Sequence, residues 1–253
     1  MCIRDRYWKS VAEKLQRYEQ KYLNEYDLVL ALTGRDLKLL KKEGLKKPSY
    51  VIPIGLDVRN YKPDFSCYKK PPTIGFIGSL DWMPNQEGLK WFLEKVWVEI
   101  IKLYPKAELH IAGRNTPKWV EKIDQTGVVI HGEVPNSIEF INRHSIMIVP
   151  LFSGSGMRVK ILEGMALGKV VVTTEMGLEG IDAIDYEEVL VSNSKEGFLY
   201  NISNCFKKSE TLPAIGHNAQ ELAAQKYDNL QIGKKLVTIY KERIAVTSKE
   251  YAI

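Results

Sequence analysis

From residue 73 onward, short apolar runs alternate with segments of helical spacing, and this alternation limits the fold more than any other feature. The predicted strands are 73–77, 107–111, 128–131, 146–150, 170–173 and 188–191. Short apolar strands that alternate with helices predict a parallel sheet covered by helices on both faces. The fold class is therefore α/β.

The clearest predicted helix covers residues 85–104. Its apolar side chains recur at helical spacing, which places them on one face. They are Leu89, Phe92, Leu93, Val96, Trp97, Ile100, Ile101 and Tyr104. We expect these aromatics in the core and not as a stacking platform for a ligand. Further helices are predicted near 195–208, 213–226 and 229–249.

The first part of the chain has a different pattern. A helix is predicted over 7–26, then buried strands over 27–32 and 49–52. Between the strands, Thr33 is a candidate cap for a helix over 36–43, which Gly44 would end. Residues 58–72 contain three prolines and resemble a linker. The first six residues resemble a junction, so the natural protein is expected to begin well upstream.

In a parallel sheet of this kind, ligands bind at the carboxyl ends of the strands. The most informative segment there is 150–168, where a strand ends at Pro150 and a helix is predicted to begin near Met157. Gly154 and Gly156 lie in the loop between them. Glycines let backbone N–H groups approach a ligand closely, and a helix N-terminus attracts anions.

Two cations strengthen this prediction of an anion site. Arg158 and Lys160 would stand in the first helical turn, where positive charge opposes the helix dipole unless an anion binds there. Glu163, one turn further on, could accept hydrogen bonds from the vicinal hydroxyls of a ribose. The alternative is a solvated surface, on which Lys160 pairs with Glu163 and Arg158 faces water.

Other chemistries fit the sequence less well. Residues 164–169 are one residue short of a P-loop, and Val170 replaces the required Ser or Thr. Residues 75–78 lack the three-glycine dinucleotide fingerprint. Three distant cysteines, four histidines without ligand spacing and no Asp-x-Asp pair predict no metal site and a reducing compartment. The Asn201-Ile202-Ser203 sequon is interpreted as chance.

A net charge of +5 mildly favours anionic partners. The basic residues are spread along the chain and are not interleaved with aromatics, so no nucleic-acid partner is expected.

Six segments together resemble the C-terminal domain of group 1 (family 4) glycosyltransferases, in both order and spacing. These segments are 76–85, 109–113, 129–134, 153–168, 170–174 and 177–181. The resemblance covers roughly residues 70–245. Upstream, residues 27–33 and 51–57 resemble the last strands of that family's N-terminal domain and its hinge.

The resemblance implies a GT-B fold, with a C-terminal Rossmann-like, doubly wound parallel sheet over residues 63–253. Residues 1–62 would be a truncated remnant of a second Rossmann-like domain, the N-terminal acceptor domain. The implied reaction is metal-independent, retaining transfer of a sugar from a UDP-, GDP- or similar nucleotide donor to a glycan or lipid-linked acceptor. No cofactor is implied.

The resemblance also assigns roles to individual residues. Arg158 and Lys160 would contact the diphosphate and stabilise the leaving group. Glu163 would hold the ribose, and Gly78 would lie near the phosphates. The loop of Gly132, Glu133 and Val134 would meet the base. Gly154, Ser155 and Gly156 would offer backbone groups to the sugar and phosphates.

Two departures from the family pattern affect these roles. Many members carry paired glutamates eight residues apart, whereas here Ser155 stands at the first position and Glu163 at the second. The family's active-site histidine belongs to the N-terminal domain, and no histidine here can be given that role. The chain is therefore expected to be inactive alone.

Two other functions stay open: a non-catalytic sugar-nucleotide-binding or interaction module, and another GT-B enzyme such as a sugar-nucleotide epimerase. The resemblance implies a bacterial, cytoplasmic protein of polysaccharide synthesis. Peripheral attachment of the longer form to the inner face of the cell membrane is a further alternative.

Overall fold

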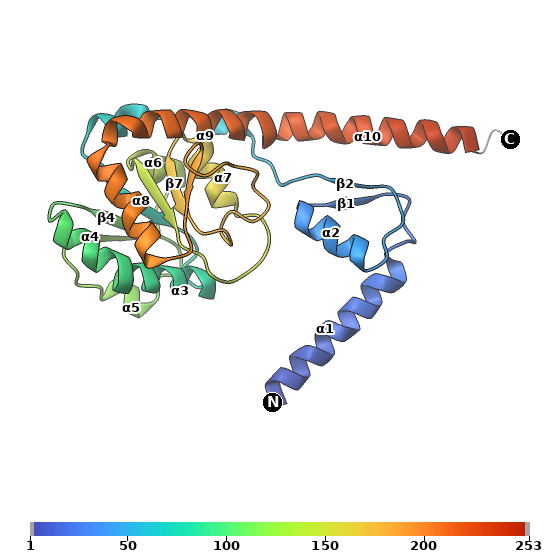
Figure 1. The fold of residues 1–253 in the computed structure, drawn as a ribbon, viewed down its shortest axis with the longest axis horizontal. Helices are drawn as coiled ribbons and strands as arrows, with labels where there is room; N and C mark the ends of the chain where they lie inside the picture. Colours follow the sequence, from blue (N-terminus) through green and yellow to red (C-terminus); the bar gives the residue numbers. More distant parts are fainter. Residues whose placement is uncertain (1–2, 251–253) are drawn as a thin grey trace. The chain divides into compact units, whose positions relative to one another are not determined.

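The structure is a computed structural model that describes residues 3–250 (Figure 1). The chain forms two compact units, Met1–Pro53 and Ile54–Ile253. The units divide nine residues before the predicted boundary at residue 62, because residues 54–62 contact elements of the second unit. The backbone N–H of Leu56 donates to the oxygen of Tyr227 at 2.7 Å. The assignment of the two parts to acceptor and donor domains stays a prediction.

The first unit contains α1 (Ile3–Tyr22), β1 (Val29–Ala31), α2 (Gly34–Lys42) and β2 (Ser49–Val51). The two strands pair in parallel. The Thr33 side chain caps α2 by accepting from the N–H of Asp36, and Gly44 follows the helix with φ +100°, as the sequence indicated. On α1, large apolar side chains such as Tyr7, Leu15 and Tyr18 are exposed.

The second unit is built around six parallel strands. They are β3 (Ile74–Ile77), β4 (Leu109–Ala112), β5 (Val128–Gly132), β6 (Ile146–Val149), β7 (Val170–Thr173) and β8 (Val189–Val191). Their order in the sheet is β5-β4-β3-β6-β7-β8. Counted from β3, this is the 3-2-1-4-5-6 order of a doubly wound, Rossmann-like fold. The predicted fold class is confirmed for this unit.

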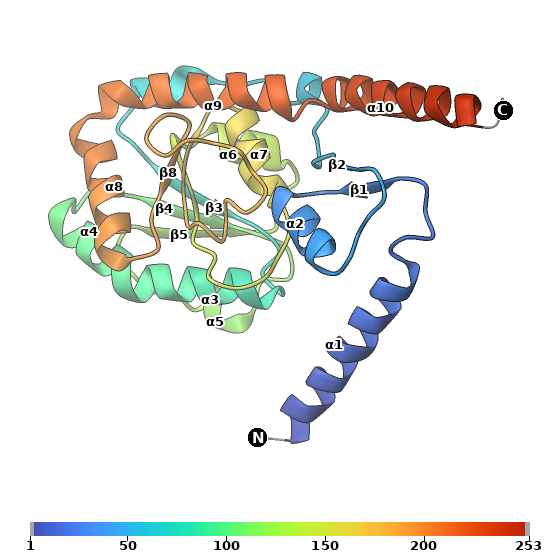
Figure 2. The same cartoon turned by 45° about the vertical axis from the view of Figure 1, so that its right-hand side comes forward.

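Helices cover both faces of this sheet (Figure 2). Side chains of α3 (Met83–Trp91), η3 (Phe92–Trp97), α4 (Val98–Leu103), α5 (Lys118–Glu121) and α8 (Lys195–Lys207) form one core. Those of α6 (Ser137–Asn142), α7 (Val159–Ala166) and α9 (Leu212–Lys226) form the other. Short 3₁₀ turns are η1 (Val58–Asn60), η2 (Phe65–Lys69) and η4 (Ser209–Thr211).

The predicted helix over 85–104 is three consecutive elements, with a π-helical turn at η3 between α3 and α4. Its aromatics belong to the core as predicted, since Phe92 and Trp97 are buried. The indole N–H of Trp97 donates to the oxygen of Thr126 at 3.0 Å, so its polar atom is also satisfied.

The chain enters and leaves the sheet unit at one place. Leu56 forms a parallel bridge with Asp228, immediately before α10 (Asn229–Glu250). The N–H of Asn229 donates to the oxygen of Leu56 at 2.8 Å, which adds to the bond from Leu56 to Tyr227. Within residues 3–250, no helix is long and apolar enough to cross a membrane.

Candidate functional site

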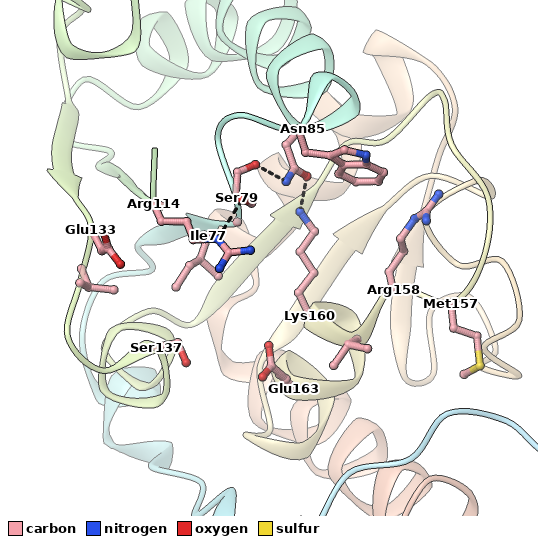
Figure 3. Close-up of a pocket in the computed structure, with 15 residues that line it drawn as sticks. Ile77, Ser79, Asn85, Arg114, Glu133, Ser137, Met157, Arg158, Lys160 and Glu163 are labelled. Atoms are coloured by element: carbon pink, nitrogen blue, oxygen red, sulfur yellow. Dashed lines mark hydrogen bonds between the residues drawn. The ribbon is translucent and has the colours of Figure 1, made fainter. Parts of the chain in front are cut away.

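A pocket of about 730 Å³ opens where the loops after β3 and β6 meet (Figure 3). These two strands are neighbours in the sheet. Their following helices α3 and α7 cover opposite faces, so a crevice forms between the loops. Ligands bind at this topological switch point in open α/β sheets. The lining residues are Ile77, Gly78, Ser79, Trp82, Asn85, Gly113, Arg114, Glu133, Val134, Ser137, Met157, Arg158, Val159, Lys160 and Glu163.

Lys160 extends from the first turn of α7 into this pocket (Figure 3). Its Nζ donates to Asn85 Oδ1 at 2.6 Å and lies 5.2 Å from the centre of the Phe76 ring. The residue is half-buried, and its ammonium end is the enclosed part. Burial, and next the charge of Arg158, lower the pKa of Lys160 to about 7. The hydrogen-bond partner of Lys160 is thus Asn85 and not the alternative partner Glu163, although the charge of Glu163 raises the pKa of Lys160 in opposition to burial.

Arg158 is the residue before α7 and not part of its first turn, because the helix begins at Val159. The side chain is only 7% exposed, so the alternative in which it faces water is also wrong. Its Nη1 donates to the oxygen of Ser155 at 2.6 Å, and the guanidinium lies 5.3 Å from the centre of the Trp82 ring.

Two further donor nitrogens of Arg158 are unpaired within the described part of the chain. Nε and Nη2 are buried and have no hydrogen-bond partner among the described residues. Burial lowers the pKa of Arg158, and the charge of Glu179 opposes that change. A buried guanidinium with unpaired N–H groups costs free energy unless an anion binds it. The geometry therefore fits an anionic ligand at the start of α7.

Glu163 lies one turn further along α7 and lines the same pocket. The Tyr61 hydroxyl donates to Glu163 Oε1 at 2.9 Å. Burial raises the pKa of Glu163, and burial with the neighbouring carboxylate raises the pKa of Tyr61 to about 12. The sequence did not indicate Tyr61, because it stands in the segment interpreted as a linker.

Gly78, Glu133 and Val134 also line the pocket. A Cβ on Gly78 would lie 2.8 Å from Asn85 Nδ2 and 3.1 Å from Lys160 Nζ. Only glycine therefore leaves the Asn85–Lys160 hydrogen bond undisturbed at this point of the loop.

The other predicted site residues are not among the lining residues. Gly154, Ser155 and Gly156 form the turn that positions Arg158, with φ +93° at Gly154 and +86° at Gly156. A Cβ on Gly154 would lie 3.1 Å from Arg158 Nη2. Gly132 ends β5 with φ +65° and directs the chain toward Glu133.

Two further pocket residues were not predicted individually. Asn85, in the first turn of α3, is buried and links the loop after β3 to the first turn of α7, since its Nδ2 donates to the oxygen of Ser79 at 2.7 Å while its Oδ1 accepts from Lys160. Arg114 reaches the pocket from the loop after β4, and its Nε donates to Ser79 Oγ at 3.0 Å. The signal that could have found them is their position shortly after the carboxyl ends of strands, Asn85 at the start of α3 and Arg114 in the loop after β4.

The P-loop-like segment has a structural role. Lys169 is fully buried, and its Nζ donates to the oxygens of Asp64 at 2.6 Å and Asn142 at 3.4 Å. The side chain therefore holds two loops together and does not reach the pocket. Among residues 3–250, no group of three or more His, Cys, Asp or Glu side chains is placed to hold a metal ion.

Comparison with known proteins agrees with this geometry. Residues 71–208 match the family described as glycosyl transferases group 1. A Klebsiella pneumoniae protein described as an uncharacterized 44.6 kDa protein in the cps region is 26% identical over 236 residues, which are 89% of this chain and 58% of that protein.

Solved structures share the fold at low identity. HepE from Anabaena in complex with UDP has a TM-score of 0.74 and 17% identity, over 90% of this chain and 67% of that one. Sucrose-phosphate synthase from Thermosynechococcus elongatus has a TM-score of 0.73 and 16% identity, over 92% of this chain and 62% of the synthase.

The chain thus spans somewhat under two thirds of the Klebsiella protein and of the synthase. The solved structures that share the fold are glycosyltransferases of the GT-B type. The family match covers more than half of the chain and includes the loops that form the pocket. The chain belongs to the group 1 glycosyltransferases.

Proposed function

We propose that the pocket binds a nucleoside-diphosphate sugar and that this chain supplies the donor-binding part of a metal-independent, retaining glycosyltransferase. The observation that carries the proposal is the buried Arg158 guanidinium, whose Nε and Nη2 have no acceptor among the described residues. Lys160 places a second cation in the same pocket. Together they provide the charge and the donors that a diphosphate requires.

The proposed chemistry is stabilisation of the leaving group. When the bond between sugar and diphosphate breaks, negative charge accumulates on the diphosphate. Cations that are already in place stabilise that charge most in the transition state. Arg158 and Lys160 would stabilise this charge without a metal ion, because both cations lie beside the proposed position of the phosphates.

Glu163 is proposed to accept hydrogen bonds from the ribose hydroxyls. Its Oε1 already accepts from Tyr61, and an ionised carboxylate has further acceptor sites. Glu133 and Val134, on the loop after β5, would contact the base. UDP or UDP-glucose is present in structures of HepE, and UDP with N-acetylglucosamine in one of the pneumococcal transferase GtfA. A uridine donor is therefore the first to test.

The acceptor would be a glycan or a lipid-linked saccharide, in line with the cps region that encodes the Klebsiella relative. Since the chain spans 58% of that relative, we propose that residues outside this chain bind the acceptor. Sugar transfer by this chain alone is then expected to be negligible.

The test is a thermal-shift titration with UDP, GDP, ADP and CMP. A ligand at about 100 times its dissociation constant stabilises a fold by about 2.7 kcal/mol. One nucleoside diphosphate should stabilise the chain, and Arg158→Ala should remove the effect. Arg143→Ala, which changes an exposed arginine, should retain it. If no nucleotide stabilises the chain, or if Arg158→Ala responds like the unchanged protein, the proposal is wrong.

A further inference from the structure

A second pocket, of about 410 Å³, lies at the β8 edge of the sheet. The turn before β8, helix α8 and the start of α9 enclose it, and Figure 2 shows α8 leading into α9 beside β8. It shares no lining residue with the pocket at the start of α7. Its volume is within the range of small-molecule sites.

Two exposed tyrosines stand at this pocket. Tyr186 is 57% exposed and Tyr200 is 60% exposed. Tyr186 has φ +63°, in the left-handed region that a bulky residue rarely adopts. The turn holds it there, since its N–H donates to the oxygen of Val189 at 2.8 Å. The chain therefore keeps an aromatic ring where glycine would be less strained, and such strain is typical of functional positions.

The buried polar group of this pocket is Asn201, which is 1% exposed. Its Oδ1 lies 3.1 Å from the hydroxyl of Tyr186, and its Nδ2 has no partner among the described residues. If the amide is turned over, Nδ2 donates to the hydroxyl and the oxygen becomes the unpaired atom. A ligand hydroxyl satisfies either arrangement, because it both donates and accepts.

The burial of Asn201 also supports the interpretation of the Asn201-Ile202-Ser203 sequon as chance.

The rest of the lining is close to neutral. Leu190, Cys205 and Leu212 are buried apolar residues, and the charged lining residues are the exposed Glu187 and Lys208, one of each sign. A phosphate needs more positive charge than one exposed lysine supplies. Aromatic rings, a buried carboxamide and an apolar floor instead match a pyranose, which presents C–H groups on its faces and hydroxyls at its rim.

We infer that this pocket is a saccharide-binding site that takes a neutral pyranoside, with Tyr186 and Tyr200 packing on the ring and Asn201 hydrogen-bonded to a hydroxyl. Because the two pockets have no residue in common, saccharide and nucleotide are expected to bind independently. The inference goes beyond the proposed donor site and does not need it to be correct.

The test is an amide-resolved NMR titration of the whole chain with methyl glycosides of glucose, galactose and N-acetylglucosamine. At least one glycoside should shift amides of 184–190 and 200–218. Tyr186→Gly removes the ring from a backbone that suits glycine, and it should weaken binding about tenfold. Tyr186→Phe keeps the ring but loses the hydroxyl at Asn201, and it should bind more tightly than Tyr186→Gly.

The control variant is Tyr26→Gly, which removes another exposed tyrosine and should leave the affinity unchanged. Titration with UDP reports separately on the proposed donor site. The inference is overturned if no glycoside shifts these amides, if Tyr186→Gly binds as the unchanged chain does, or if UDP is the ligand that shifts them. Failure of every nucleoside diphosphate to bind contradicts the proposed function, whereas a glycoside that shifts these amides still supports the saccharide site.

Discussion

Donor affinity should depend on pH through Lys160, whose pKa in the free chain is about 7. A diphosphate binds the ammonium form, so the apparent dissociation constant rises as that form becomes rare. With this pKa, about a tenth of the side chains are protonated at about pH 8, and binding should be roughly tenfold weaker than at about pH 6.5. The nucleotide contributes little, because a phosphate's second pKa is about 6.

Isothermal titration calorimetry with UDP, or with whichever nucleotide binds, measures both the affinity and the protons taken up. Repeating the titration at about pH 8 in buffers of different ionisation enthalpy should reveal uptake close to one proton per nucleotide. Lys160→Arg keeps the charge at every pH of the series and should remove the uptake. An affinity that is constant from about pH 7 to 9, with no proton uptake, would refute the reasoning.

Three further predictions concern stability. His144 is buried, and burial together with the charges of its histidine neighbours lowers its pKa to about 3. In the unfolded chain the pKa is near 6.5, so at pH values under about 6.5 the free energy of unfolding should decrease by up to roughly 1.4 kcal/mol for each pH unit. Urea titrations should show a smaller decrease for His144→Gln. Gly88→Ala should lower the melting temperature by an amount equivalent to about 1–3 kcal/mol, because its Cβ would collide with the carbonyl oxygen of Pro150. Lys169→Met should cost about 1–3 kcal/mol in chemical denaturation, because the backbone oxygens of Asp64 and Asn142 lose the buried ammonium that holds their two loops together.

Matched controls separate these effects from general sensitivity to mutation. Gly233→Ala adds a Cβ with no atom within 4 Å inside α10, so it should stabilise by about 0.5–1 kcal/mol. Lys234→Met changes an exposed lysine and should be nearly neutral. Equal responses of Gly88→Ala and Gly233→Ala, or of the two lysine variants, would contradict the assigned contacts.

The fold could be predicted from the sequence because it depends on local patterns. Each predicted strand of the sheet unit has a counterpart within two residues at either end, and Thr33 and Gly44 bound α2 through geometry that only neighbouring residues determine. Arg158, Lys160 and Glu163 were found for a similar reason, since one short segment contains all three. How deeply Arg158 and Lys160 are buried could not be predicted, because their burial depends on residues that follow β3, such as Trp82 and Asn85.

The residues that were missed act across long sequence separations. Tyr61 meets Glu163, and Asn85 meets Lys160. Neither pair can be inferred from spacing, because each depends on which loops the strand order brings together. The π-helical turn at η3 is of another kind: the apolar periodicity of residues 85–104 predicts a helix without showing that its hydrogen-bond pattern changes.

The bridge between Leu56 and Asp228 determines how the sheet unit would respond to mechanical load. The two segments run parallel, one entering the unit and the other leaving it. Tension applied between the segment before Ile54 and the far end of α10 pulls them in opposite directions. The bonds from Leu56 to Tyr227 and from Asn229 to Leu56 are then loaded in shear, while the six strands carry no force until both bonds break. Single-molecule pulling from these two points should therefore break these two hydrogen bonds and detach α10 before the sheet unfolds.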